Sequence, residues 1–285
     1  MFIHKKEIFM IDCHTHTCNS PDAENTVSEL CEQAIALGLD VLAITEHCEV
    51  NRFYSIEYYN ATPNGYDTYN FDLSFEKSMQ DNTKAQQKYH NRLNLISGIE
   101  LGQATHDFEL AEKIISDERL DFVIGSMHQL PNHDDFAFIN YNEVDIPSLL
   151  SENYFEVLKL CRWGKFDVLG HLTYTLRYIG NYGITVDMKS YDEIIVECFK
   201  ALINSGKGIE INSSGLRQTY GKTFPDFNYI KLYKDLGGEI LTVGSDSHSI
   251  HDLTKGIPEG IELAKLAGFK YVCYFKKRKP YFIKI

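Results

Sequence analysis

Two pairs of potential metal ligands with the same spacing stand near opposite ends of the 285-residue chain. His14 and His16 form the first pair, and Asp246 and His248 form the second. Each pair follows a short apolar run, residues 8–11 and 240–243, of the kind that forms a buried strand. Residues i and i+2 of a strand point to the same side. We therefore expect each pair to present two ligands in one direction, and the two pairs to meet if the sheet closes into a barrel.

More residues that can bind metal stand where other apolar runs end. His47, Glu100, His128 and His171 each follow such a run, and Asp22 lies on the loop after His16 and could fold back. Imidazole is a common ligand of zinc, iron and manganese, and carboxylates suit a site that bridges metals. So many buried polar groups would be costly without partners. The set exceeds the needs of one or two metals, so we expect three divalent metal ions (zinc, iron or manganese) among His14, His16, Asp22, His47, Glu100, His128, His171, Asp246 and His248.

The remaining histidines and the nearby cysteines fit ordinary roles better. We expect ordinary surface or helix positions for His4, His90, His106 and His251. Among the remaining histidines, only His133 is kept as a residue that could approach the site. Cys13 precedes the first pair by one residue and should point away from it.

Strands and helices alternate along the chain. Thr26-Val27-Ser28-Glu29 matches a capping box that opens a helix, and Gly38 suits its end. Seven apolar strands with helical patterns between them predict an α/β fold with a parallel sheet, closed or nearly closed into a TIM-like (β/α)7 barrel. An eighth strand is predicted at Tyr271–Phe275. The polar residues cluster at the carboxyl ends of the strands, where barrel enzymes place their sites, so we expect one domain over residues 1–285.

Two stretches are longer than the other connections. Residues 49–93 are rich in tyrosine and become helical from about Ser74, and residues 132–146 carry four acidic side chains. Both should emerge on the face of the site, where a lid or substrate wall and an ordered surface loop are about equally expected.

Composition limits the partners and the compartment. The formal net charge of −12 argues against a nucleic-acid surface, and no apolar run reaches the length of a membrane span. Seven cysteines without a CxxC pair favour reduced thiols and a cytoplasmic protein, and the N-terminus has no apolar segment typical of a signal peptide.

Two arginines are candidates for binding a small phosphorylated substrate. Arg177 follows His171 by six residues, and Arg217 ends the segment Ser213-Ser214-Gly215-Leu216-Arg217. A guanidinium group has a planar fork that fits phosphate oxygens. An arginine paired with a surface carboxylate is the ordinary alternative for both, and Arg162 is a weaker candidate because it should end a helix on the outside.

The ordered motifs resemble those of the polymerase-and-histidinol-phosphatase (PHP) superfamily, over about residues 8 to 278. The matching segments are Asp12-Cys13-His14-Thr15-His16-Thr17, Thr45-Glu46-His47, Gly98-Ile99-Glu100, Gly125-Ser126-Met127-His128, Leu169-Gly170-His171 and Gly244-Ser245-Asp246-Ser247-His248. Within the superfamily the chain is most similar to the bacterial histidinol-phosphate phosphatases, with Glu210-Ile211-Asn212-Ser213-Ser214-Gly215-Leu216-Arg217 as the most telling stretch.

The resemblance implies a distorted seven-stranded barrel with three metals. By analogy, His14, His16, Glu100 and Asp246 would hold one metal, and Glu100 would bridge to a second held by His128 and His171. Asp22, His47 and His248 would hold the third, with Asp22 the least secure because the first loop varies in length. Arg177 and Arg217 would bind the phosphate.

The resemblance thus implies metal-dependent hydrolysis of L-histidinol phosphate to L-histidinol and phosphate, in histidine biosynthesis. Asp246 or His248 could protonate the leaving alkoxide. The main alternative keeps the chemistry but changes the substrate to nucleotides, oligonucleotides or phosphotyrosine. A non-catalytic module like that of some DNA polymerases would not need the complete ligand set found here. A deaminase of the amidohydrolase type would usually need a lysine after the fourth strand, where Ser126-Met127-His128 stands instead.

Overall fold

The computed structural model describes residues 9–50, 71–131 and 133–285. Its main sheet contains seven parallel strands in the order of the sequence, from β1 to β7. The strands are β1 (Ile11–Asp12), β2 (Val41–Glu49), β3 (Asn94–Gly102), β4 (Phe122–Ser126), β5 (Val168–Leu169), β6 (Gly208–Asn212) and β7 (Leu241–Gly244). Backbone hydrogen bonds then join the first strand to the last, from Cys13 N–H to the Val243 carbonyl at 3.0 Å and from His16 N–H to the Ser247 carbonyl at 2.9 Å. The predicted seven-stranded barrel is confirmed.

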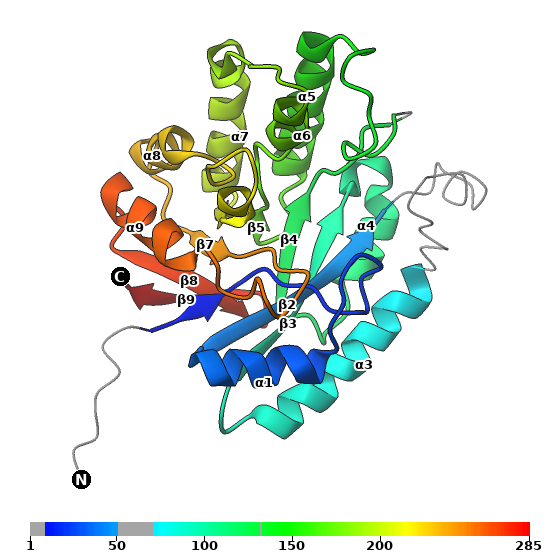
Figure 1. Ribbon diagram of the computed structural model, residues 1–285, viewed down its shortest axis with the longest axis vertical. Coiled ribbons are helices and arrows are strands. Elements are labelled where there is room, and N and C mark those ends of the chain that lie inside the picture. The colour runs from blue at the N-terminus through cyan, green and yellow to red at the C-terminus, as the bar shows by residue number, and fades with distance from the viewer. Residues whose placement is uncertain (1–8, 51–70, 132) are drawn as a thin grey trace.

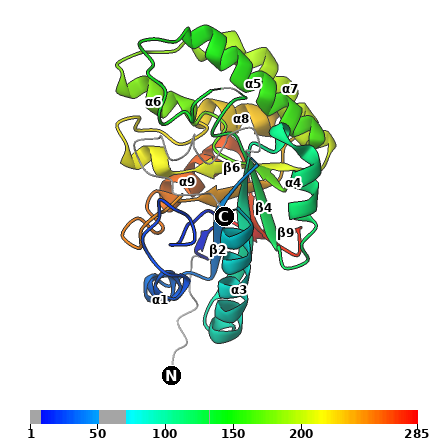
Figure 2. The same ribbon diagram turned by 90° about the vertical axis from the view of Figure 1, so that its right-hand side faces the viewer.

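Helices surround the barrel, as Figures 1 and 2 show. In both views α5 and α7 lie side by side at one end of the molecule, and α1 and α3 lie together at the opposite end. The α-helices are α1 (Val27–Leu37), α3 (Phe71–Tyr89), α4 (Phe108–Ile115), α5 (Ile146–Trp163), α6 (Thr175–Asn181), α7 (Asp192–Asn204), α8 (Phe227–Asp235) and α9 (Ile257–Ala267). The described residues also form the short 3-10 helices η1 (Ala104–His106), η2 (Met188–Tyr191) and η3 (Ser214–Arg217).

The first helix shows how local sequence sets the ends of these elements. Thr26 accepts a hydrogen bond from the backbone of Glu29, and the Glu29 side chain accepts one from the backbone of Thr26, so the predicted capping box is present. Gly38 ends the helix with φ 77°, a left-handed conformation that glycine adopts without a steric penalty. Leu30, Cys31 and Ala34 are buried, which fixes the face of α1 that packs on the barrel.

A hairpin closes the end of the barrel opposite to the predicted site. The predicted eighth strand exists as β8 (Tyr271–Lys276), but it pairs in antiparallel fashion with β9 (Lys279–Lys284) and not with the barrel. At the hairpin turn, Arg278 donates from Nε to the buried carboxylate of Asp167 at 2.5 Å. The backbone N–H of Lys277 donates to the carboxylate of Asp121 at 2.9 Å. Because Asp121 and Asp167 directly precede β4 and β5, the hairpin is attached at the amino ends of these strands.

The two long connections are described in part. Residues 51–70, which carry most of the tyrosines of the first stretch, lie outside the described residues, so the lid interpretation is not tested there. The helix predicted from about Ser74 begins at Phe71. Tyr141 is buried in the second stretch, which runs into α5 at Ile146. Among the described helices, none combines the length and apolar character that crossing a bilayer requires.

Candidate metal centre

The carboxylate of Glu100 lies at the centre of the site. Glu100 is on β3 with its side chain 1% exposed. One oxygen, Oε1, lies 3.0 Å from His128 Nε2 and 2.6 Å from His171 Nε2. The other, Oε2, lies 3.3 Å from His14 Nε2 and 3.0 Å from His47 Nδ1. Four imidazoles from different parts of the chain therefore surround one carboxylate.

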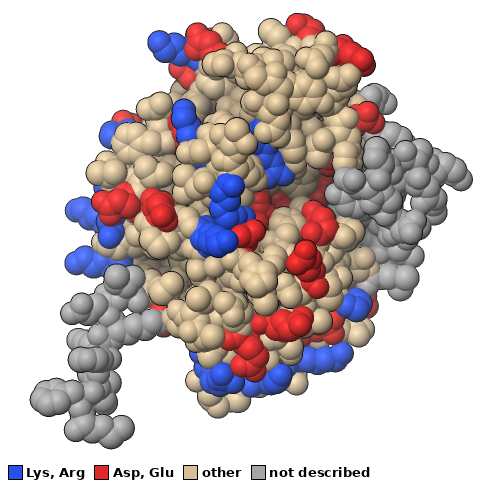
Figure 3. Space-filling view, in the orientation of Figure 1, with Lys and Arg blue, Asp and Glu red and all other residues tan. Residues whose placement is uncertain are grey.

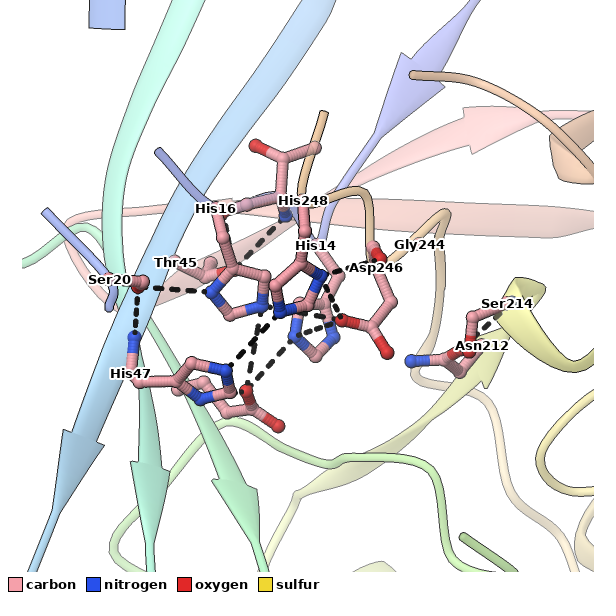
Figure 4. A network of polar contacts seen from close by, with 12 residues as sticks. His14, His16, Ser20, Thr45, His47, Asn212, Ser214, Gly244, Asp246 and His248 are labelled. Atoms are coloured by element: carbon pink, nitrogen blue, oxygen red, sulfur yellow. Dashed lines mark hydrogen bonds and ion pairs between the residues drawn. The ribbon is translucent and has the colours of Figure 1, made fainter. Parts of the chain in front are cut away.

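The two ligand pairs at the ends of the sequence meet beside Glu100. His14 Nε2 and His16 Nε2 lie 3.7 Å and 3.3 Å from Asp246 Oδ1. Asp246 follows β7 in a left-handed conformation with φ 53°, which Asp adopts more readily than most residues. This turn brings its side chain toward the two histidines, as Figure 4 shows. The predicted convergence of the pairs is confirmed.

A second side of the site is more open. Here His47 and His248 approach each other with 3.4 Å between their Nε2 atoms. Asp22 does fold back from the first loop, with Oδ2 3.5 Å from His47 Nε2 and 3.2 Å from His248 Nε2. The side chains of Asp22 and His248 are 35% and 31% exposed, which leaves this part of the site accessible to a small molecule.

Three triplets of these residues have the geometry to hold a metal ion. In each triplet, one ligand atom from each residue lies within 4.8 Å of the others; the triplets are His14 with His16 and Asp246, His16 with His47 and His248, and His47 with Glu100 and His128. Among the described residues, His14 Nε2, His16 Nε2 and Glu100 Oε2 are buried and have no hydrogen bond. Buried polar atoms of this kind need partners. A divalent cation between them would supply those partners, so this donor set fits a metal.

The electrostatics also fit cations. Burial would raise the pKa of Glu100, but His128, His14 and His47 hold it well below its usual range. Burial lowers the pKa of His128, but Glu100 and Glu49 raise it to about 10. In the absence of metal, the imidazoles thus supply the positive charge that the carboxylates require. For His16, burial together with His47 and His248 lowers the pKa to about 3, which favours the neutral ring that ligates metal.

Three glutamates behind the candidate ligands were not predicted as site residues. Glu49 Oε1 lies 2.9 Å from His128 Nδ1, and Glu210 Oε1 lies 2.7 Å from His14 Nδ1. Glu46 accepts a hydrogen bond from Ser20 Oγ at 2.5 Å, and Ser20 lies 3.4 Å from His16 Nδ1. Each of these three histidines therefore has a polar group at the ring nitrogen that faces away from the cluster. The sequence feature that could have identified them is a charged residue within an otherwise apolar strand. Glu49 also follows the predicted ligand His47 by two positions.

The two candidate arginines lie near the cluster in different environments. The guanidinium carbon of Arg177 lies 4.3 Å and 4.5 Å from the ring centroids of Tyr174 and Tyr178, and Nη2 donates to both hydroxyls. Arg217 donates from Nη1 to the carbonyl of Ser245 at 2.8 Å and from Nη2 to the carbonyl of Asp246 at 3.2 Å. Arg217 therefore also holds the loop that carries Asp246. Figure 3 shows basic and acidic side chains close together around a hollow in the centre of this face.

His133 is the one further histidine that could approach the site, whereas Cys13 is predicted to point away from it and Arg162 to end a helix on the outside. His133 Nε2 lies 3.3 Å from Glu152 Oε2 in a partly exposed ion pair. The Cys13 thiol donates to the carbonyl of Cys273 within the core and so points away from the histidine pair, as predicted. Arg162 is exposed near the end of α5.

Comparison with known proteins decides the family. The family model described as "PHP domain" matches residues 12–214 of the chain. The chain belongs to the PHP family. The matched region contains seven of the nine candidate ligands and ends at the first residue of η3; the other two, Asp246 and His248, follow it on the chain.

This PHP protein is similar to known proteins over almost its whole length. It is 26% identical over 270 residues to a "Probable histidinol-phosphatase" of Thermotoga maritima, covering 94% of this chain and 97% of the relative. It is 26% identical over 274 residues to the "Histidinol-phosphatase" of Lactococcus lactis, covering 94% and 95%. A crystal structure of histidinol phosphate phosphatase from Lactococcus lactis, complexed with zinc, L-histidinol and phosphate, has a TM-score of 0.76 at 23% identity and covers 95% of this chain and 98% of that one. This similarity confirms the barrel fold.

Proposed function

We propose that this PHP protein is a metal-dependent phosphomonoesterase that hydrolyses L-histidinol phosphate to L-histidinol and phosphate. The observation that carries the proposal is the convergence of His14, His16, His128 and His171 on the carboxylate of Glu100 in a buried site. Two PHP relatives of nearly the same length, each 26% identical, have names that describe the same activity. The proposed reaction belongs to histidine biosynthesis, in the cytoplasm and without nucleic acid.

The proposed site holds three divalent cations, which are zinc, iron or manganese. His14, His16, Glu100 and Asp246 would hold one, and Glu100 would bridge to a second held by His128 and His171. Asp22, His47 and His248 would hold the third. The distances around Glu100 support a bridging carboxylate, since Oε1 faces His128 and His171 and Oε2 faces His14 and His47. Bound cations would polarise a phosphoryl oxygen and lower the pKa of a water from ~16 towards neutrality.

The protein's own residues then bind and orient the substrate. Arg177 and Arg217 would donate hydrogen bonds to the phosphate oxygens, since each guanidinium group has five N–H donors and lies beside the cluster. The tyrosine rings that flank Arg177 limit its movement and hold its charge in place. Asp246 or His248 would deliver a proton to the leaving oxygen of histidinol. His248 is the more accessible of the two, with a side chain 31% exposed compared with 9% for Asp246.

Turnover of a panel of phosphate esters tests the proposal. The metal-loaded protein would be assayed with L-histidinol phosphate, a nucleoside monophosphate, a short oligonucleotide and phosphotyrosine. We expect the highest kcat/KM for L-histidinol phosphate. Faster turnover of a nucleotide or of phosphotyrosine would contradict the substrate assignment but retain the phosphatase chemistry.

A pair of variants tests the role of the cluster in the same assay. Glu100→Gln should abolish turnover of every ester, because it removes the charge that the surrounding imidazoles share. Asp167→Asn is the matched control, since Asp167 is an equally buried carboxylate that holds the hairpin at the other end of the barrel. Equal activity in the two variants would contradict the proposed site.

A further inference from the structure

Glu210 is a buried carboxylate that contacts two candidate ligands from different parts of the site. It lies on β6 with its side chain fully buried. Oε1 lies 2.7 Å from His14 Nδ1, and Oε2 accepts a hydrogen bond from the backbone N–H of His171 at 3.1 Å. Asn212 Nδ2 donates to the same Oε2 at 3.3 Å. His14 and His171 belong to different proposed metals, so one carboxylate links the two.

A glycine beside His14 makes room for this carboxylate. A Cβ atom at Gly244 would lie 2.6 Å from Glu210 Oε1 and 2.3 Å from His14 Cβ, which is closer than real contacts allow. Figure 4 shows Gly244 and Asn212 on the side of the site where Asp246 and His14 lie. The glycine two residues before Asp246 is therefore required for a steric reason that involves Glu210, since any side chain there would push the carboxylate away from His14.

The contact to Glu210 determines which nitrogen of His14 can bind a metal. A neutral imidazole carries one proton, and an ionised carboxylate only accepts hydrogen bonds. With Nδ1 facing Glu210, the proton must be on Nδ1, so the lone pair is on Nε2. Nε2 is the atom that faces Glu100 at 3.3 Å and Asp246 at 3.7 Å. Carboxylates that accept from the far nitrogen of a ligating histidine fix the orientation of the ring and make it a better ligand.

We propose that Glu210 is a positioning residue that fixes His14 in the Nδ1–H form and holds the backbone of His171, and so maintains two metals of the cluster together. The inference rests on the proposed metal site but not on the identity of the phosphate ester. Glu49 differs in its contacts, since its Oε1 lies beside two candidate ligand rings, 2.9 Å from His128 Nδ1 and 3.5 Å from His47 Nδ1, whereas Glu210 contacts the ring of one ligand and the backbone N–H of another.

Glu210→Gln tests the inference because an amide cannot replace both oxygens. The amide has one acceptor and one donor end. Its oxygen is drawn to the position of Oε2, where the backbone N–H of His171 and Asn212 Nδ2 both donate. Asn212 cannot turn to compensate, because its Oδ1 accepts from Ser214 N at 3.0 Å and from Ser214 Oγ at 2.7 Å. The amide NH₂ then faces His14 Nδ1 and favours the tautomer with the proton on Nε2, which cannot ligate.

The experiment measures zinc binding and the protonation of His14, without any substrate. Metal-free wild type and Glu210→Gln would be titrated with zinc against a competing chelator, with the stoichiometry determined by elemental analysis. We expect the variant to bind at least one zinc about 10- to 100-fold more weakly. Asp167→Asn, the control, should lose stability but bind zinc as wild type does, because its carboxylate holds Val123 N at 2.9 Å at the opposite end of the barrel.

Nitrogen-15 NMR of the zinc-loaded wild type gives a second readout that does not depend on the folding of Glu210→Gln. The His14 signal, identified by its loss in His14→Gln, should show a proton on Nδ1. An unprotonated Nδ1 would overturn the inference, and so would zinc binding by Glu210→Gln that equals wild type or an equal loss in Asp167→Asn. Failure of wild type to bind zinc would instead refute the metal site itself, whereas zinc binding without histidinol-phosphatase activity would leave the role of Glu210 intact.

Discussion

Replacement of Arg217 by alanine separates substrate binding from loop support. We propose that the guanidinium group binds the phosphate, and the structure shows that it also holds the carbonyls of Ser245 and Asp246. A hydrogen bond to a charged partner contributes about 1.5–3 kcal/mol. Since about 1.4 kcal/mol corresponds to a tenfold change, Arg217→Ala should raise KM for the phosphate ester by about 10- to 150-fold.

The support of the Asp246 loop predicts a smaller, separate effect. Loss of two hydrogen bonds to backbone carbonyls should weaken metal binding at the position of Asp246, which elemental analysis after dialysis would detect. Steady-state kinetics would therefore be measured at saturating zinc or manganese, so that the change in KM reports the phosphate contact. Arg162→Ala is the control, because Arg162 is an exposed arginine near the end of α5. An unchanged KM together with a lower metal content would show that Arg217 acts only through the loop, and would refute its role in phosphate binding.

Three further predictions concern the metal site and the barrel. In the zinc titration against a chelator, Gly102→Ala should weaken metal binding about tenfold, because its Cβ would lie 2.0 Å from Glu49 Oε2 and displace the partner of His128. Gly180→Ala is the control and should bind zinc as wild type does, because no described atom lies within 4 Å of a Cβ at that position. Burial lowers the pKa of His128, but Glu100 and Glu49 raise it to about 10, so zinc must displace a proton from this ring below that pH. Zinc affinity should therefore rise about tenfold per pH unit as the pH approaches that value. Calorimetry that finds no proton release on zinc binding would contradict this. Arg278→Ala should lower the free energy of unfolding of the metal-free protein, measured in urea, by about 2–4 kcal/mol, because it leaves the buried Asp167 carboxylate without its arginine. Weaker zinc binding by this variant would contradict the separation of the hairpin from the metal site.

The barrel and the members of the site could be predicted because both depend on periodic local patterns. The apolar runs predicted the seven strands, and the i and i+2 spacing of His14 with His16 predicted that both face one way. The Thr26–Glu29 capping box is a similar local signal, and it is present. Asp22 could be proposed from its proximity to the first pair, but its approach to His47 and His248 depends on how the first loop folds.

Other features depend on contacts between distant segments and have weak local signals. Glu210 is in the middle of the apolar strand β6, and its role is apparent only because His14, which follows β1, and His171, which follows β5, both reach it in the folded barrel. The position of β8 outside the barrel depends on the hairpin turn, where Arg278 reaches Asp167 across 111 residues of sequence. The dual contacts of Arg217 likewise join η3 to the loop after β7, which sequence spacing does not indicate.

Anomalous diffraction from a crystal of the metal-loaded protein at the zinc or manganese edge tests the central claim most directly. We predict three peaks around Glu100, with ligand distances of about 2.0–2.2 Å to the imidazole nitrogens and carboxylate oxygens named above. Peaks at other places on the barrel, or no peak among these side chains at saturating metal, would contradict the account.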